Sequence, residues 1–240
     1  MSRTLKALSA LLTYPTVELQ EAAPEIGLIL AEDEFIPKGV WRQLSVLTTE
    51  LATGDLYDLQ ERYVLLFDRT RSLSLHLFEH VHGESRDRGQ AMIDLKSQYE
   101  QANLLMSAAE LPDFLPMFLE YLSTRPLKDA CETLGQPAHI LAAIAERLRK
   151  RQSAYESVFR ALVALSAAKP KDDDVAALLQ LPDPEATDLA ALDAAWEDEP
   201  VNFGPGSGDG CKDGLIARVR GALRPAPDMP PATRNVPPRP

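Results

Sequence analysis

Apolar positions recur every three to four residues along most of this chain, which is the period of an amphipathic α-helix. The pattern starts near the N-terminus at Leu5, Leu8 and Leu12, and its longest run extends from Pro137 to about Ala168. Alternating Val- and Ile-rich runs are absent, and no Asn-Gly or Asp-Gly pair separates two apolar runs as a hairpin turn would. The sequence therefore predicts an all-α fold.

Residues that favour helix ends divide this pattern into segments. We expect Thr16 to cap a short helix that ends at Pro24. Pro37 opens a helix that ends before Gly54, and Asp55 caps the next one. Further helices are expected at residues 72–82, 87–109 and 111–123, after Pro126, from Pro137 to about Ala168, and at residues 172–181 and 185–196.

The composition changes after Phe203. Residues 204–214 are rich in glycine, and residues 225–240 hold seven of the nineteen prolines. Such compositions are typical of flexible segments without a packed core. The sequence predicts one globular multi-helix domain at residues 1–203 and a disordered C-terminal tail at residues 204–240.

Charge narrows the classes of partner. The chain has a formal net charge of -11, and because its last 37 residues hold six Lys/Arg against three Asp/Glu, residues 1–203 carry -14. An acidic domain repels phosphate backbones, which excludes nucleic acid as a partner and favours a basic or amphipathic peptide.

No apolar run approaches the roughly 18 residues of a membrane span, and the short N-terminal apolar run lacks the cleavage site of a signal peptide. We expect a cytoplasmic protein that does not insert into the membrane.

The stretch SLHLFEHVHGESRDRGQAM, residues 74–92, holds the densest polar chemistry. His76, Glu79 and His80 read H-x-x-E-H, a pattern of zinc hydrolases. On a helix the two imidazoles lie about 40° apart, whereas His82 points away from them. Zinc needs a third protein ligand, and Glu100, Glu110 and Glu120 are equal candidates. The alternative without metal is a polar helix–helix corner, in which Glu79 and Glu84 pair with Arg86 or Arg88.

The surrounding residues carry a family resemblance. LYDLQERYVLLFDRTRSLSLHLFEHVHGESRDRGQAMIDL, residues 56–95, resembles the signature region of the NarJ family within the wider TorD/DmsD-like group, and we call it the signature block. LSALLTYPT near the start, ELPDFLPMFLEYLS at residues 110–123 and AWEDEPVNFG at residues 195–204 resemble NarJ segments in the expected order. The resemblance covers roughly residues 4–204.

The resemblance implies a soluble, all-helical, cytoplasmic chaperone of the NarJ/TorD-like type that is not an enzyme. Such chaperones bind the N-terminal peptide of the nitrate reductase α subunit. They hold the immature αβ complex until bis-molybdopterin guanine dinucleotide is inserted, and they bind no cofactor permanently. Molybdenum cofactor biosynthesis proteins are implied as further partners.

Several residues of the signature block are candidates for the peptide site: Tyr63, Phe67, Asp68, His76, Glu79, His80, His82, Arg86 and Gln90. The helical stripe favours a core role for Tyr63 and Phe67. Asp68 and Glu79 are more often helix caps or ion-pair partners.

His76 and His80 give a hypothesis of pH-dependent peptide release, because imidazoles change charge near neutrality. A peptide affinity that stays constant between about pH 6 and pH 8 would contradict it.

Two other functions stay open at this point. One is a zinc-dependent hydrolase that uses the H-x-x-E-H stretch, and the other is a helical adaptor for another molybdoenzyme.

Overall fold

The computed structural model of the chain describes residues 2–80, 86–106, 110–184 and 187–190. Within these ranges the regular structure is helical, apart from one isolated β-bridge between His76 and Phe114. This confirms the predicted all-α class. The predicted tail and the segment AWEDEPVNFG lie outside the described residues, so the boundary at residue 203 stays a prediction.

The described residues form ten α-helices, one π-helical turn and two 3-10 turns. The α-helices are α1 (Ser2–Leu11), α2 (Val17–Ala31), α3 (Lys38–Thr53), α4 (Leu56–Tyr63), α5 (Arg86–Gln101), α6 (Leu115–Ser123), α7 (Leu127–Leu134), α8 (Ala138–Lys150), α9 (Glu156–Leu165) and α10 (Asp172–Leu179). The short turns are η1 (Val64–Asp68, π), η2 (Arg71–Leu73, 3-10) and η3 (Leu77–His80, 3-10).

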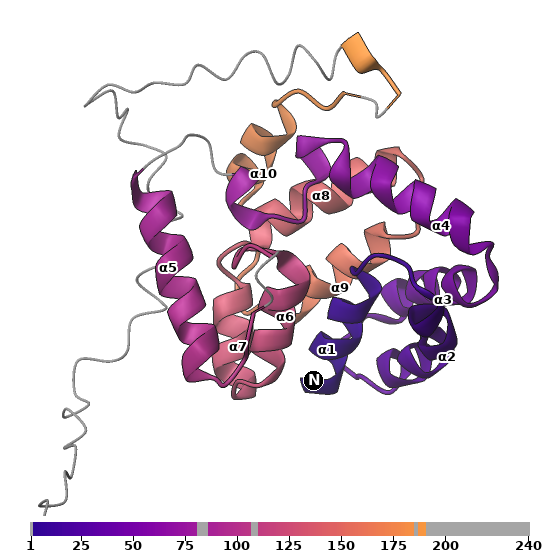
Figure 1. Cartoon of the computed structure of the whole chain (residues 1–240), viewed down its shortest axis with the longest axis horizontal. Coiled ribbons are helices and arrows are strands. Elements are labelled where there is room, and N and C mark those ends of the chain that lie inside the picture. The colour runs from indigo at the N-terminus through magenta and orange to yellow at the C-terminus, as the bar shows by residue number, and fades with distance from the viewer. Residues whose placement is uncertain (1, 81–85, 107–109, 185–186, 191–240) are drawn as a thin grey trace, which may run out of the picture.

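The core lies around α1, α8 and α9. In Figure 1, α2 and α3 lie on one side of these helices, and α5 lies on the opposite side beyond α6 and α7. The predicted N-terminal amphipathic helix is confirmed, because Leu5, Leu8 and Leu12 are buried. α1 packs on α6, and the Ser9 hydroxyl donates to the Pro116 carbonyl at 2.6 Å.

Local capping places the first helices. The Leu19 amide donates to the Thr16 hydroxyl at 3.2 Å, and Asp55 accepts from the Tyr57 amide at 2.9 Å. Such side-chain acceptors satisfy amides that have no partner within the helix. Pro37 and Gly54 flank α3 as predicted. The predicted end of α2 at Pro24 is wrong.

Pro24 stands inside α2, which continues to Ala31. The side chain of Pro24 is exposed, so the carbonyl that loses its helical partner lies on the water side of the helix. The opposite face, with Ala23, Ile26 and Leu30, is buried against α3. Burial of this face outweighs the local cost of the proline.

The long helix predicted from Pro137 to Ala168 is two helices, α8 and α9. The backbone turns at Gln152, whose φ is 53°. The Ser153 amide donates to the Leu148 carbonyl and the Gln152 amide to the Arg149 carbonyl, both at 3.0 Å. This is a Schellman C-cap with glutamine where glycine is usual. The apolar period continues across the break, because Tyr155 at the N-cap of α9 and Phe159 and Leu162 on that helix are buried.

Candidate functional site

Residues 70–80, which we call the corner segment, do not form the predicted helix over 72–82. η2 and η3 flank an extended stretch at residues 74–76. The Leu77 amide donates to the Asp113 carbonyl at 3.1 Å, and the Leu115 amide donates to the Leu75 carbonyl at 2.8 Å. The Ser74 hydroxyl also accepts from the His76 amide at 3.1 Å. Serine that bonds the local backbone competes with a helix, and the segment before α6 offers the backbone partners instead.

Asp113 is the centre of this corner. Its side chain is 0% exposed, and one carboxylate oxygen accepts from the Phe78 amide at 3.0 Å. The other oxygen lies 3.2 Å from Nδ1 of His76. Behind it, the Tyr99 hydroxyl of α5 donates to the Pro112 carbonyl at 2.8 Å. One buried carboxylate thus joins the corner segment to the start of α6.

The two histidines differ in charge state. The hydrogen bond to Asp113 raises the pKa of His76 above its ordinary value. Burial, with a smaller contribution from the positive charges of Arg147 and Arg71, lowers the pKa of His80 to about 4. Nε2 of His80 lies 2.8 Å from the Ser74 carbonyl, which can only accept, so this nitrogen carries the proton. His80 is therefore neutral at physiological pH, whereas the pKa of His76 lies above its ordinary value.

A proton NMR titration of the imidazoles should separate these two residues. We expect the His76 signal to titrate above 6.5, its ordinary value, and the His80 signal near 4. Because the His76 pKa is raised in the fold, its pairing with Asp113 stabilises the protein fully below 6.5. That contribution is lost as the pH rises through the folded value. Asp113→Asn should move the His76 midpoint back toward 6.5, and equal midpoints near that value would contradict the assignment.

The corner does not assemble the predicted zinc ligands. The ring of His76 is paired with Asp113 and that of His80 with the Ser74 carbonyl. Among the described residues, no three His, Cys, Asp or Glu side chains are grouped closely enough to hold a metal ion. His82 lies outside the described residues.

The other polar candidates differ in exposure and position. Glu79 is half-buried, and its carbonyl accepts from Nε of Arg71 at 3.3 Å. Asp68 is exposed, and Gln90 is exposed on α5 and donates to Asp94 at 2.8 Å. Arg86 begins α5, and its side chain lies outside the described residues. Of the polar candidates, the structure thus brings together His76, Glu79 and His80.

Tyr63 and Phe67 lie in the core, each 4% exposed. Their rings meet at 5.0 Å, and the Phe67 ring lies 5.1 Å from that of Tyr155 on the N-terminal side of α9. The Tyr63 hydroxyl donates to the Leu12 carbonyl at 2.8 Å. The π-helical turn η1 includes Phe67 and keeps it turned inward. In this conformation both rings contact other core residues and not solvent.

A small cavity lies beside the corner segment. Its lining is mainly apolar and comes from η3, α5, α6, α7 and α8: Leu77, Phe78, Leu95, Asp113, Phe118, Thr133, Gln136, Pro137 and Ile140. Within the described structure, Oε1 of Gln136 is buried and has no hydrogen-bond partner. Thr133, Gln136 and Ile140 lie outside the segments that carry the family resemblance by their motifs, and only the fold brings them next to the signature block.

Acidic groups surround His76 at the edge of this corner. Besides Asp113, the carboxylates of Glu79 and Glu110 lie close enough to raise the His76 pKa further. Glu110 is exposed, and the neighbouring Leu111 side chain is 48% exposed. The cavity has room for about one water molecule and most of its lining is buried, so its surface edge, with the exposed Leu111 and the acidic Glu79 and Glu110, is the part that suits a segment with apolar and basic side chains.

Comparison with known proteins identifies similar chains. The sequence model of the family described as "Nitrate reductase delta subunit" matches residues 33–161. The Escherichia coli K12 protein "Nitrate reductase molybdenum cofactor assembly chaperone NarJ" is 42% identical over 92% of this chain and 94% of its own length. The probable chaperone NarW of the same strain is 39% identical over 83% of each chain. A probable NarJ of Bacillus subtilis is 29% identical over 67% of this chain and 86% of its own.

Proposed function

Because the chain belongs to the nitrate reductase delta subunit family, we propose that it binds the N-terminal peptide of a nitrate reductase α subunit and keeps the immature enzyme ready for cofactor insertion. The family consists of assembly factors, so the chain is a chaperone and not an enzyme, and the zinc hydrolase hypothesis falls. The observation that carries the proposal is the 42% identity over 92% of the chain to a protein named for this assembly task.

We place the peptide at the cavity beside the corner segment. Two features support this place: the apolar lining contributed by η3 and α5 to α8, and the acidic groups around His76. A signal-like peptide is amphipathic and basic, so its apolar face would cover the cavity while its basic side chains face Glu79 and Glu110. Burial of apolar surface supplies affinity, and the opposite charges direct the peptide.

The mechanism is binding and timing. While the peptide is held, the immature αβ complex keeps its cofactor pocket accessible to bis-molybdopterin guanine dinucleotide, which belongs to the partner enzyme. Molybdenum cofactor biosynthesis proteins would meet the complex at this stage, in the cytoplasm. The chaperone leaves when the folded enzyme competes for its own N-terminal segment. Among the described residues, no helix has the length and apolar character that crossing a bilayer requires.

Isothermal titration should show binding of a peptide from the start of the α subunit with a Kd in the micromolar range or tighter, about -8 kcal/mol. Thr133→Phe should weaken this binding by about tenfold or more, since a phenyl ring at the half-buried Thr133 position would fill the cavity. Thr49→Phe is the matched control, because Thr49 is exposed on α3, outside the cavity lining. Equal loss of affinity in both variants would place the peptide elsewhere.

A peptide from another molybdoenzyme of the same class tests the adaptor alternative, which predicts that this peptide binds at least as tightly as the nitrate reductase peptide.

The same titrations test the pH hypothesis. It now depends on His76, since His80 stays neutral well below pH 6. Protonated His76 would repel a basic peptide, so affinity should fall between about pH 8 and pH 6. His76→Gln should remove this dependence.

A further inference from the structure

The chain from Asp172 to Pro184, which we call the strap, lies across α8. It consists of α10 and the five residues after it. In the described structure α10 packs against α8 without a single fully buried residue, although Leu178 is partly buried against the core. Apolar burial therefore contributes little to holding the strap, and its polar contacts determine its position.

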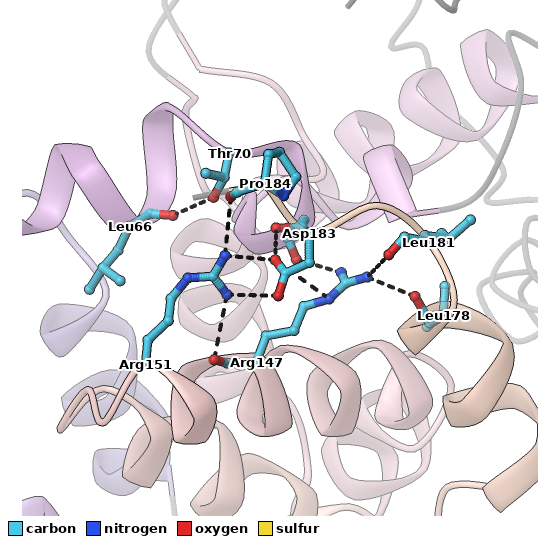
Figure 2. A network of polar contacts seen from close by, with 9 residues as sticks. Leu66, Thr70, Arg147, Arg151, Leu178, Leu181, Asp183 and Pro184 are labelled. Carbon is cyan, nitrogen blue, oxygen red and sulfur yellow. Dashed lines mark hydrogen bonds and ion pairs between the residues drawn. The ribbon is translucent and has the colours of Figure 1, made fainter. Parts of the chain in front are cut away.

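The carboxylate of Asp183 is the main polar contact of the strap. Arg151, the residue that follows α8, donates to its two oxygens at 3.0 and 2.7 Å, and the Ser72 hydroxyl of η2 donates at 2.6 Å. Nε of Arg147 lies 4.0 Å from the same carboxylate. Figure 2 shows Arg147 of α8 and Arg151, at the C-cap of that helix, both extending toward Asp183. Burial alone would raise the pKa of Asp183, but the bonds from Arg151 and Ser72 lower it below its ordinary value.

Two of the residues that bind or face the Asp183 carboxylate, Arg147 and Ser72, are buried in the core. Arg147 is 2% exposed and Ser72 is 6% exposed. Arg147 donates from Nη1 to the Ser72 carbonyl at 2.8 Å and from Nη2 to the Leu178 carbonyl at 2.7 Å. Two guanidinium groups and a hydroxyl are thus fixed in one place, with a geometry that suits a carboxylate.

We propose that Ser72, Arg147 and Arg151 form a carboxylate receptor that Asp183 occupies reversibly, so that the strap can be displaced by an acidic segment of a partner. When the strap leaves, two adjacent positive charges remain in a domain of negative net charge, and a second carboxylate is the ligand that neutralises them. The strap itself defines the chemistry of the displacing segment: a short helix with a few apolar residues, followed by an aspartate or glutamate.

Displacement of the strap would also affect the corner segment. Ser72 donates its hydroxyl to the strap, and its carbonyl is held by Arg147, so one residue joins the receptor to the segment that contains His76 and His80. Loss of Asp183 removes the hydroxyl contact and leaves the carbonyl contact in place. We therefore expect the corner segment to loosen when the strap opens, while α8 stays folded.

Amide hydrogen exchange on the full chain tests the receptor. Asp183→Ala should speed exchange of the α10 amides by about tenfold or more, since it removes charge-assisted hydrogen bonds. Exchange at residues 72–80 should rise as well, with that of α8 unchanged. Asp173→Ala, at an exposed position of α10, is the matched control and should change α10 exchange by less than about threefold. Unchanged α10 exchange in Asp183→Ala, or an equal rise in α8, would overturn the proposal.

A peptide with the sequence of residues 172–184 tests displacement directly. A fluorescent form should bind the full-chain Asp183→Ala variant, whose receptor is vacated, and should bind the unaltered chain at least about tenfold more weakly because its own strap competes. The same peptide with alanine in place of its aspartate at 183 should not bind the variant. Equal binding of both peptides would show that the carboxylate is not what the receptor recognises, and no binding of either would show that the receptor takes no segment in trans.

Discussion

Replacement of Arg147 with alanine is expected to lower the free energy of unfolding by about 3–5 kcal/mol, the usual cost of breaking a buried charge network. The guanidinium holds the carbonyls of Ser72 and Leu178, which belong to segments far apart in the chain. Alanine leaves both carbonyls without this donor and opens a cavity where the long side chain lay. Arg147→Lys should recover only part of the loss, because one ammonium cannot reproduce the planar fork.

Urea denaturation of the full chain measures this effect. Arg149→Ala is the matched control on the same helix, because the Arg149 side chain is 59% exposed and pairs with Glu146 at the surface. We expect this control to unfold at the same urea concentration as the unaltered chain, within error. An Arg147→Ala variant with an unshifted midpoint would show that the network contributes nothing to stability.

Replacement of Asp113 with alanine is the second change with a large expected effect, a loss of about 3 kcal/mol in the free energy of unfolding. The carboxylate is completely buried and accepts from the Phe78 amide, which would lose its partner. His76 would lose its partner at the same time. Because both contacts hold the corner segment against the start of α6, peptide affinity should fall together with stability.

Asp113→Asn removes the charge of this side chain but keeps its shape, so it shows how much of the stability loss comes from each. The amide keeps one acceptor for the Phe78 amide, so this variant should lose clearly less stability than Asp113→Ala. Asp129→Ala on the exposed surface of α7, where the carboxylate lies 3.8 Å from Arg125, is the surface control and should change the urea midpoint little. If Asp113→Ala behaves like this control, the carboxylate does not hold the corner.

Helix boundaries could be predicted where one residue decides them locally. Thr16 and Asp55 are clear examples, since each side chain accepts a hydrogen bond from backbone amides two or three residues later. The end of α5 could also have been predicted. Asn103 has a φ of 58° and stands at the position after the helix that favours glycine or asparagine. The prediction that this helix continues to residue 109 overlooked that signal.

Boundaries that depend on tertiary packing could not be predicted in this way. Glutamine at 152 has no preference for a positive φ, and the apolar period runs through the break between α8 and α9. Pro24 is tolerated because its side of α2 faces water. In both places packing of neighbouring faces outweighs the local preference of one residue.

Helical geometry did not predict how the residues of the candidate site are arranged. The zinc interpretation placed His76 and His80 on one helix face, whereas the structure places His76 just before the 3-10 turn η3 and His80 at the end of that turn. The partner of His76 is Asp113, 37 residues away, and no spacing rule connects them. The nine candidates taken from the signature block include Tyr63 and Phe67, which pack in the core, and lack Asp113 and Thr133.

The contact between α1 and α6 has a consequence for the order of synthesis. In α1, Leu5, Leu8 and Leu11 are buried, and Ser9 bonds to a carbonyl 107 residues later in the chain. At roughly 5–20 residues per second, translation takes on the order of 5–20 s to supply that partner. During this interval the apolar face of α1 is available to general chaperones or to a nascent neighbour.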